Sequence, residues 1–153
     1  MQGAASGGVD SPIVKRGDGH RHGADTDVLR LTTPASADSL GSIRSGVADF
    51  LGGHGAGAAV IADFELAVSE LATNVIRHTP ASSISVMLSH EPGRWVLDVA
   101  DADGVPPLES VELPEVTQIT GRGLFVVKSV MDTVAVVEVG GAQVVRCVRF
   151  IST

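Results

Sequence analysis

The longest regular pattern in the chain lies at residues 58–78, which read AAVIADFELAVSELATNVIRH. Its large apolar residues recur every three or four positions, and this spacing places them on one face of an α-helix. Pro80 follows closely and cannot continue a helix. The sequence therefore predicts a long amphipathic helix whose buried face carries Ile61, Phe64, Val68, Leu71 and Val75.

Shorter patterns on both sides of this helix complete the predicted order of elements. A strand and a helix precede it, and a hairpin, a short helix and a second hairpin follow it. In chain order these elements are residues 28–32, 36–51, 84–88, 95–101, 123–131, 133–139 and 142–151. The order predicts an α/β (α+β) fold, a two-layer sandwich in which a mixed, mainly antiparallel sheet has helices on one face.

Residues 1–25 differ in composition from the rest of the 153-residue chain. They contain six glycines and almost no large apolar side chain, so they cannot bury enough surface to pack. We therefore predict a flexible N-terminal tail, residues 1–25, followed by one folded domain, residues 26–153.

Charge and cysteine content exclude several classes of protein. Lys and Arg number 11 and Asp and Glu number 18, so the formal charge is −7 and direct nucleic-acid binding is not expected. No apolar run approaches the length of a membrane span, so no membrane association is expected. The single cysteine, Cys147, allows no internal disulfide, which fits a cytoplasmic protein.

Polar residues also follow the helical spacing at residues 58–78. Glu70 and Asn74 fall on one edge of the apolar face, and His78 lies nearer its centre. Such a polar ledge would line a cleft between helix and sheet. The alternative interpretation is an ordinary solvated helix face.

Two further segments carry residues that suit a ligand. Asp101, Ala102, Asp103 and Gly104 come directly after a predicted strand, where a carboxylate can accept a hydrogen bond from an exocyclic amine or can simply form a turn. Residues 120–124 lead from a proline-containing loop into a helix. Glycines at a helix N-terminus let backbone N–H groups approach an anion. No Gly-Lys-Ser/Thr sequence follows, so this is not a Walker loop.

The order and spacing of these three elements resemble the GHKL nucleotide-binding family, in which they are called the N box, the G1 box and the G2 box. Within that family, the run SELATNVIRH at residues 69–78 is similar to the bacterial anti-sigma factor serine/threonine kinases. The resemblance covers about residues 27–151 and implies a histidine-kinase-like ATPase fold. The G1 segment departs from the family pattern, which is close to Asp-x-Gly-x-Gly, because Asp103 and Val105 stand where the two glycines are expected and Gly104 is displaced by one position.

The resemblance implies roles for particular residues. Glu70 would be the catalytic base, Asn74 would hold Mg²⁺, and Asp101 would bind the adenine amino group. Residues 105–120 would form a lid over ATP. The remaining residues that would line the nucleotide site are His78, Gly104, Thr120, Gly121, Arg122, Gly123 and Leu124.

The implied function is a regulator of transcription that uses ATP and Mg²⁺. It would bind a sigma factor and phosphorylate serine or threonine on a STAS-type antagonist protein, and the resemblance also allows a homodimer. The altered G1 segment favours an alternative, a kinase-inactive partner-switching module. The ATPase domain of a sensor histidine kinase is disfavoured, because no helical segment with a phosphoacceptor histidine is expected before residue 27.

Overall fold

The computed structural model describes residues 13–16, 26–78, 83–101 and 121–152. Its elements follow the predicted order of strand, helices, hairpin, helix and hairpin. They are β1 (Ile13–Arg16), β2 (Asp27–Pro34), the short 3₁₀ helix η2 (Ala37–Ser39), α1 (Leu40–Gly53), α2 (Ala58–His78), β3 (Ser83–Glu91), β4 (Arg94–Asp101), α3 (Gly121–Val130), β5 (Thr133–Val139) and β6 (Ala142–Phe150).

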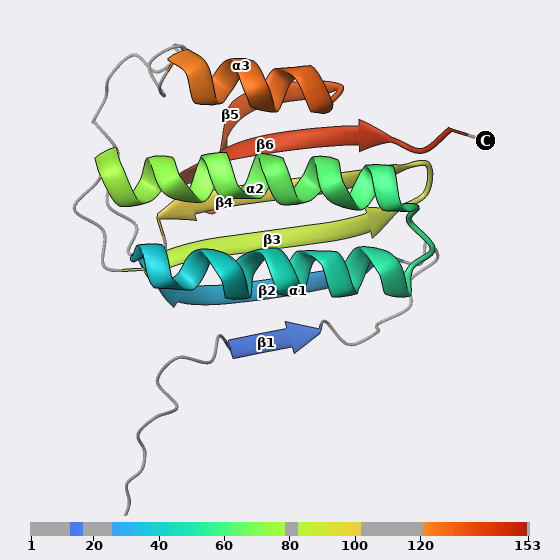
Figure 1. The fold of residues 1–153 in the computed structure, drawn as a ribbon, viewed down its shortest axis with the longest axis horizontal. Helices are drawn as coiled ribbons and strands as arrows, with labels where there is room; N and C mark the ends of the chain where they lie inside the picture. Colours follow the sequence, from blue (N-terminus) through green and yellow to red (C-terminus); the bar gives the residue numbers. More distant parts are fainter. Residues whose placement is uncertain (1–12, 17–25, 79–82, 102–120, 153) are drawn as a thin grey trace, which may run out of the picture.

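The strands form one sheet with the order β1-β2-β3-β4-β6-β5. Each pairing among the described strands is antiparallel. Figure 1 shows that helices α1, α2 and α3 lie together over one face of this sheet. The predicted two-layer fold with a mainly antiparallel sheet and helices on one face is confirmed.

Strand β1 lies within the segment that the composition predicts to be a flexible tail. Ile13–Arg16 pairs with β2, with Ile13 opposite Thr32 and Arg16 opposite Leu29. The structure therefore differs from the expectation at these four positions. A short edge strand needs only backbone hydrogen bonds to a neighbour, so a segment with few large side chains can still form it.

The core lies between the sheet and helices α1 and α2. Phe64, Val68 and Leu71 at the centre of the predicted face of α2 are at most 2% exposed, whereas Ile61 and Val75 at its ends are partly buried. Strand β4 contributes Leu97 and Val99 to this core from the sheet. Side chains alternate between the two faces of a strand, so Leu97 and Val99 fix which face of β4 the helices cover.

Alternation places a pair of charges on the opposite face. Asp98 of β4 lies directly opposite Arg146 of β6 and is 5% exposed. Arg146 donates two hydrogen bonds of 2.8 Å to the two oxygens of this carboxylate. These hydrogen bonds also raise the pKa of Arg146. A buried carboxylate is tolerated here because its partner supplies a bidentate contact.

The structure shifts the start of α1 and keeps the turn of the second hairpin at the two glycines between the predicted strands. Helix α1 begins at Leu40 rather than near residue 36, because Ser36 is extended and η2 forms the first turn. Between β5 and β6, Gly140 and Gly141 both have positive φ, 59° and 85°. This is the backbone conformation that a two-residue hairpin turn needs, and glycine adopts it at little cost.

In the described part of the chain, the helices are too short or too polar to cross a bilayer.

Candidate nucleotide-binding site

Glu70 and Asn74 lie one turn apart on α2 and therefore share one side of the helix. Both side chains are half-buried, and the side-chain nitrogen of Asn74 is shielded from solvent. Their neighbours Leu71 and Ala72 are buried in the core. The two polar residues thus lie at the border between the packed face and the exposed face of α2, where a ledge beside the core was predicted.

Asp101 is the last residue of β4 and lies opposite Ile84 of β3. It follows Leu97 and Val99 at a spacing of two, so alternation places it on the face of the sheet that the helices cover. One of its carboxylate oxygens, Oδ2, is shielded from solvent. The structure therefore directs the carboxylate of Asp101 toward the helix layer at the end of the strand.

Helix α3 begins at Gly121, two residues earlier than predicted, so that Gly121 and Gly123 both lie in its first turn. The backbone places Arg122 and Leu124 in the same turn. Free N–H groups of a first helical turn, together with the helix dipole, favour an anion. Glycine in this turn leaves room for a ligand to approach the backbone.

These three elements meet at one end of the molecule. Helix α2 contacts both β4 and α3. Figure 1 shows the C-terminal end of α2, the arrowhead of β4 and the beginning of α3 at the same side. The fold thus brings Glu70, Asn74, Asp101 and the first turn of α3 to a common end, although they are separate in sequence.

The other predicted site residues are placed only in part. His78 is the last residue of α2, and its side chain lies outside the described residues. Gly104, Thr120 and the predicted lid, residues 105–120, also lie outside them. Their roles stay predictions.

The polar residues described at this end of the molecule are of the kind that can hold Mg²⁺. Among the described residues, no group of three or more His, Cys, Asp or Glu side chains forms a protein cage for a metal. Mg²⁺ does not require one, because it is usually held by one or two protein oxygens together with phosphate oxygens and water. The half-buried amide of Asn74 supplies one oxygen of the required kind.

An inward-pointing arginine that the sequence analysis did not single out holds α3 to the rest of the domain. Arg149 of β6 donates hydrogen bonds from Nη1 to Oδ2 of Asp63 on α2, at 2.6 Å, and to the carbonyl oxygen of Val130 at the end of α3, at 2.9 Å. Alternation in β6 is the signal that could have found it, since Arg149 shares a face with buried Cys147. A cation at a helix C-terminus is also favoured by the helix dipole.

A second contact of this kind joins α1 to α2 next to Glu70. Arg44 of α1 donates from Nη1 to the Ser69 hydroxyl at 3.3 Å. Ser69 in turn donates to the carbonyl oxygen of Glu65 at 2.8 Å. Nothing in the apolar spacing marks Arg44, because its partner is 25 residues away in the sequence.

Cys147 has no part in the chemistry of this site. It is fully buried in β6, and burial raises the pKa of its thiol to about 12, with a further contribution from the negative charge of Asp98. The thiolate is the reactive form of cysteine, so a thiol held protonated is inert.

The buried thiol predicts a loss of stability in alkaline solution. The pKa of Cys147 is about 12 in the folded protein against an ordinary value of 9.0. Because the folded value is the higher one, its contribution to stability is fully present below pH 9.0 and is lost as the pH rises toward 12. A shift of this size is worth roughly 4 kcal/mol in total. Urea unfolding of wild type and Cys147→Ala between about pH 8 and 11 measures how the free energy of unfolding falls as the pH rises. An equal fall for the two proteins would contradict the raised pKa of Cys147 in the folded protein.

Comparison with known proteins identifies the class of protein. Residues 33–149 match the family described as the histidine kinase-like ATPase domain. The match covers most of the chain, so the chain belongs to this family of ATP-binding domains.

One solved structure illustrates the fold. The RsbU and RsbW domains of Rv1364c from Mycobacterium tuberculosis superpose with a TM-score of 0.60 at 19% sequence identity. The match covers 82% of this chain and 34% of the solved one, so this chain spans about a third of the length of that protein. At this identity the likeness shows the fold alone. No curated protein gives a significant match.

Proposed function

We propose that the protein is an anti-sigma regulatory kinase. It binds a sigma factor, binds ATP, and transfers the γ-phosphoryl group to a serine or threonine of a STAS-type antagonist protein. The observation that carries the proposal is the meeting of the C-terminal end of α2, the end of β4 and the first turn of α3 at one end of a histidine kinase-like ATPase domain. The likeness of residues 69–78 to the anti-sigma kinases supports this member of the family over others.

In this proposal the backbone and Asp101 bind the nucleotide. The Asp101 carboxylate accepts a hydrogen bond from the adenine amino group, which guanine replaces with a second acceptor. The N–H groups in the first turn of α3 bind phosphate oxygens, with Gly121 and Gly123 allowing close approach. Arg149 joins the C-terminal end of α3 to Asp63 near the beginning of α2, and these contacts hold the two helices side by side.

Glu70 and Asn74 divide the remaining chemistry. The Glu70 carboxylate accepts the proton of the attacking serine or threonine hydroxyl as its oxygen forms a bond to the γ-phosphorus and ADP leaves. The side-chain oxygen of Asn74 holds Mg²⁺, which neutralises charge on the phosphates when it is bound. Both residues lie on the same side of α2, so one helix orients the base and the metal ligand together.

A second candidate is a partner-switching module that binds the same proteins without transferring phosphate. The segment after Asp101 favours it, because Asp103 and Val105 stand where the family pattern has glycine. A side chain at these positions reduces the space for the nucleotide and an added carboxylate repels its phosphates.

Titration calorimetry with Mg-ATP tests the proposal. We expect Mg-ATP to bind wild type, and Asn74→Ala to weaken Mg-ATP binding by about tenfold or more, because a ligand of the metal is lost. The effect should shrink when Mg²⁺ is removed with a chelator.

The control for this experiment is Gln143→Ala, which removes an amide side chain from an exposed position in β6 and should leave affinity unchanged. GTP is the control ligand, and binding as tight as that of ATP would remove Asp101 from its role. Failure of wild type to bind Mg-ATP would contradict the kinase proposal. Equal losses with and without Mg²⁺ would show that Asn74 does not hold the metal.

A further inference from the structure

Among the residues that the structure describes, a few large apolar side chains are more than a third exposed. They are Leu66 on α2, Phe125 on α3, Val139 on β5 and Phe150 on β6. Phe125 is 73% exposed and Leu66 is 42% exposed. An apolar side chain gains free energy when a partner removes it from water, so two such side chains on one surface suit an interface.

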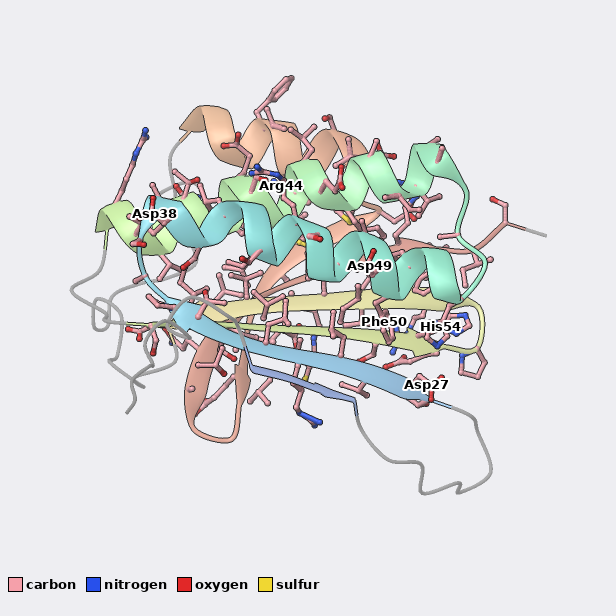
Figure 2. The ribbon with its side chains drawn as sticks, turned by 60° about the horizontal axis from the view of Figure 1, so that its bottom comes forward. Asp27, Asp38, Arg44, Asp49, Phe50 and His54 are labelled. Atoms are coloured by element: carbon pink, nitrogen blue, oxygen red, sulfur yellow. The ribbon has the colours of Figure 1, made fainter. Side chains whose placement is uncertain are left out.

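Leu66 and Phe125 both point away from the sheet. Leu66 comes two residues after Phe64, and Phe125 comes two residues before Val127. Phe64 and Val127 are fully buried. Two residues correspond to about 200° around an α-helix, so each exposed side chain lies opposite to the buried one on its helix. Figures 1 and 2 both show α3 beside α2 over the same face of the sheet, so Leu66 and Phe125 share the outer surface of this helix pair.

The hydrogen bonds of Arg149 show that the two side chains lie at similar levels along the helices. Nη1 of Arg149 contacts both Asp63 near the beginning of α2 and the carbonyl oxygen of Val130 at the end of α3. Leu66 is three residues beyond Asp63, and Phe125 is five residues before Val130. The helices run in opposite directions, so at a rise of about 1.5 Å per residue the two levels differ by only about 3 Å. Leu66 and Phe125 thus form one exposed apolar pair.

Helix α1 does not continue this apolar surface. Asp38, just before α1, and Asp49, within it, are exposed, and Figure 2 shows both at this helix. Arg44 of α1 is turned toward α2, where it donates to Ser69. Charged groups of this kind stay solvated, so the apolar surface ends at α1 and is confined to α2 and α3.

The apolar pair borders the candidate nucleotide-binding site. Leu66 lies one turn before Glu70 on α2, and Phe125 lies about one turn after Gly121, the first residue of α3. In the proposed function a protein hydroxyl reaches Glu70 and lies about 3–3.5 Å from the phosphorus that it attacks. A specific interface covers about 800 Å² on each partner, which is a patch of about 16 Å radius. A protein substrate that reaches Glu70 therefore also covers the apolar pair.

We propose that Leu66 and Phe125 form the docking contact for the protein whose serine or threonine is phosphorylated. This inference rests on the proposed function, because the nearness of Glu70 selects the phosphoacceptor protein over a sigma factor or a second copy of the chain. The Phe125 ring enters an apolar recess of that protein, and Leu66 packs beside it. The apolar pair contributes to affinity for the protein substrate and takes no part in the chemical step.

Binding and phosphate transfer, measured on the same full-length variants, test the docking contact. We expect Phe125→Ala to raise the Kd and the KM for a STAS-type antagonist protein about tenfold or more, because a ring that the complex buries is lost. Leu66→Ala should raise both by a smaller factor, since less of its side chain is exposed. Titration calorimetry measures the Kd. The affinity for Mg-ATP and the transfer rate at saturating antagonist should stay at the wild-type values.

Phe150→Ala is the matched control, because it removes the same ring from another exposed position. Phe150 is 55% exposed and lies opposite Arg94 at the start of β4, whereas the end of β4 lies at the candidate site. Figure 1 shows the arrowhead of β6 at the side of the molecule opposite to the beginning of α3. We expect this variant to bind the antagonist with the wild-type Kd.

The results separate the docking contact from the kinase activity. Equal Kd values for wild type and Phe125→Ala, with transfer intact in both, would overturn the docking contact alone. A Kd that depends on Phe125 without any phosphate transfer would support the docking contact and contradict the kinase. Weaker sigma-factor binding or self-association in Phe125→Ala, at an unchanged Kd for the antagonist, would assign the apolar pair to another partner and overturn the inference. Wild type that binds no STAS-type protein would overturn both proposals.

Discussion

Replacing Glu70 with glutamine should lower the rate of phosphoryl transfer by about 10²–10⁴-fold while ATP binding is retained. Glutamine keeps the size and the hydrogen-bonding capacity of the side chain but does not take up a proton from the attacking hydroxyl. Glu70 is half-buried on α2, so the substitution removes a charge without leaving a cavity. The measurement is single-turnover transfer from radiolabelled ATP to a purified STAS-type antagonist protein.

Helix α2 offers a matched control for this prediction. Glu65 is half-buried on the same helix and lies five residues earlier, so Glu65→Gln makes the same chemical change away from Asn74. We expect it to transfer phosphate at the wild-type rate. Transfer by Glu70→Gln at the wild-type rate would remove Glu70 from catalysis. Absence of transfer by wild type to any STAS-type protein, with ATP binding intact, would favour the partner-switching module.

Replacing Phe64 with alanine should cost about 3–5 kcal/mol of the free energy of unfolding. Phe64 is fully buried at the centre of the packed face of α2, between this helix and the sheet. Alanine loses the apolar area and leaves a cavity that the close-packed core fills only in part. Urea unfolding at about pH 7, followed by circular dichroism, measures the change.

Phe125→Ala is the control for the effect of removing an aromatic ring. Phe125 is 73% exposed on α3, so its removal leaves no cavity in the core. It should therefore change the free energy of unfolding by less than about 0.5 kcal/mol. A loss below about 1 kcal/mol for Phe64→Ala would show that α2 does not pack on the sheet through this residue. The pair of variants thus separates burial in the core from helix propensity.

The candidate site could be predicted from the sequence only in part. The spacing of Glu70 and Asn74 along a helix is local information, and so is the position of Asp101 after a strand. That these residues lie at the same end as the first turn of α3 depends on how α2 packs on β4 and α3, which no single segment encodes. Their chemical roles rest on the family resemblance and on the experiments above.

Local patterns were enough for the elements themselves. The apolar spacing and Pro80 placed α2 at the residues where it is found, and Gly140 with Gly141 placed the turn between β5 and β6. Each of these signals acts within one or two turns of backbone, so the sequence alone could determine it.

Contacts between distant residues were decided by the tertiary structure. Arg149 meets Asp63, which is 86 residues away, and His54 meets Asp27, which is 27 residues away. Periodicity tells which face a residue occupies but not which partner lies opposite, because the partner depends on strand order and register. The same holds for β1, whose pairing with β2 no composition could show. Backbone hydrogen bonds form such an edge strand, and they carry no sequence signature of their own.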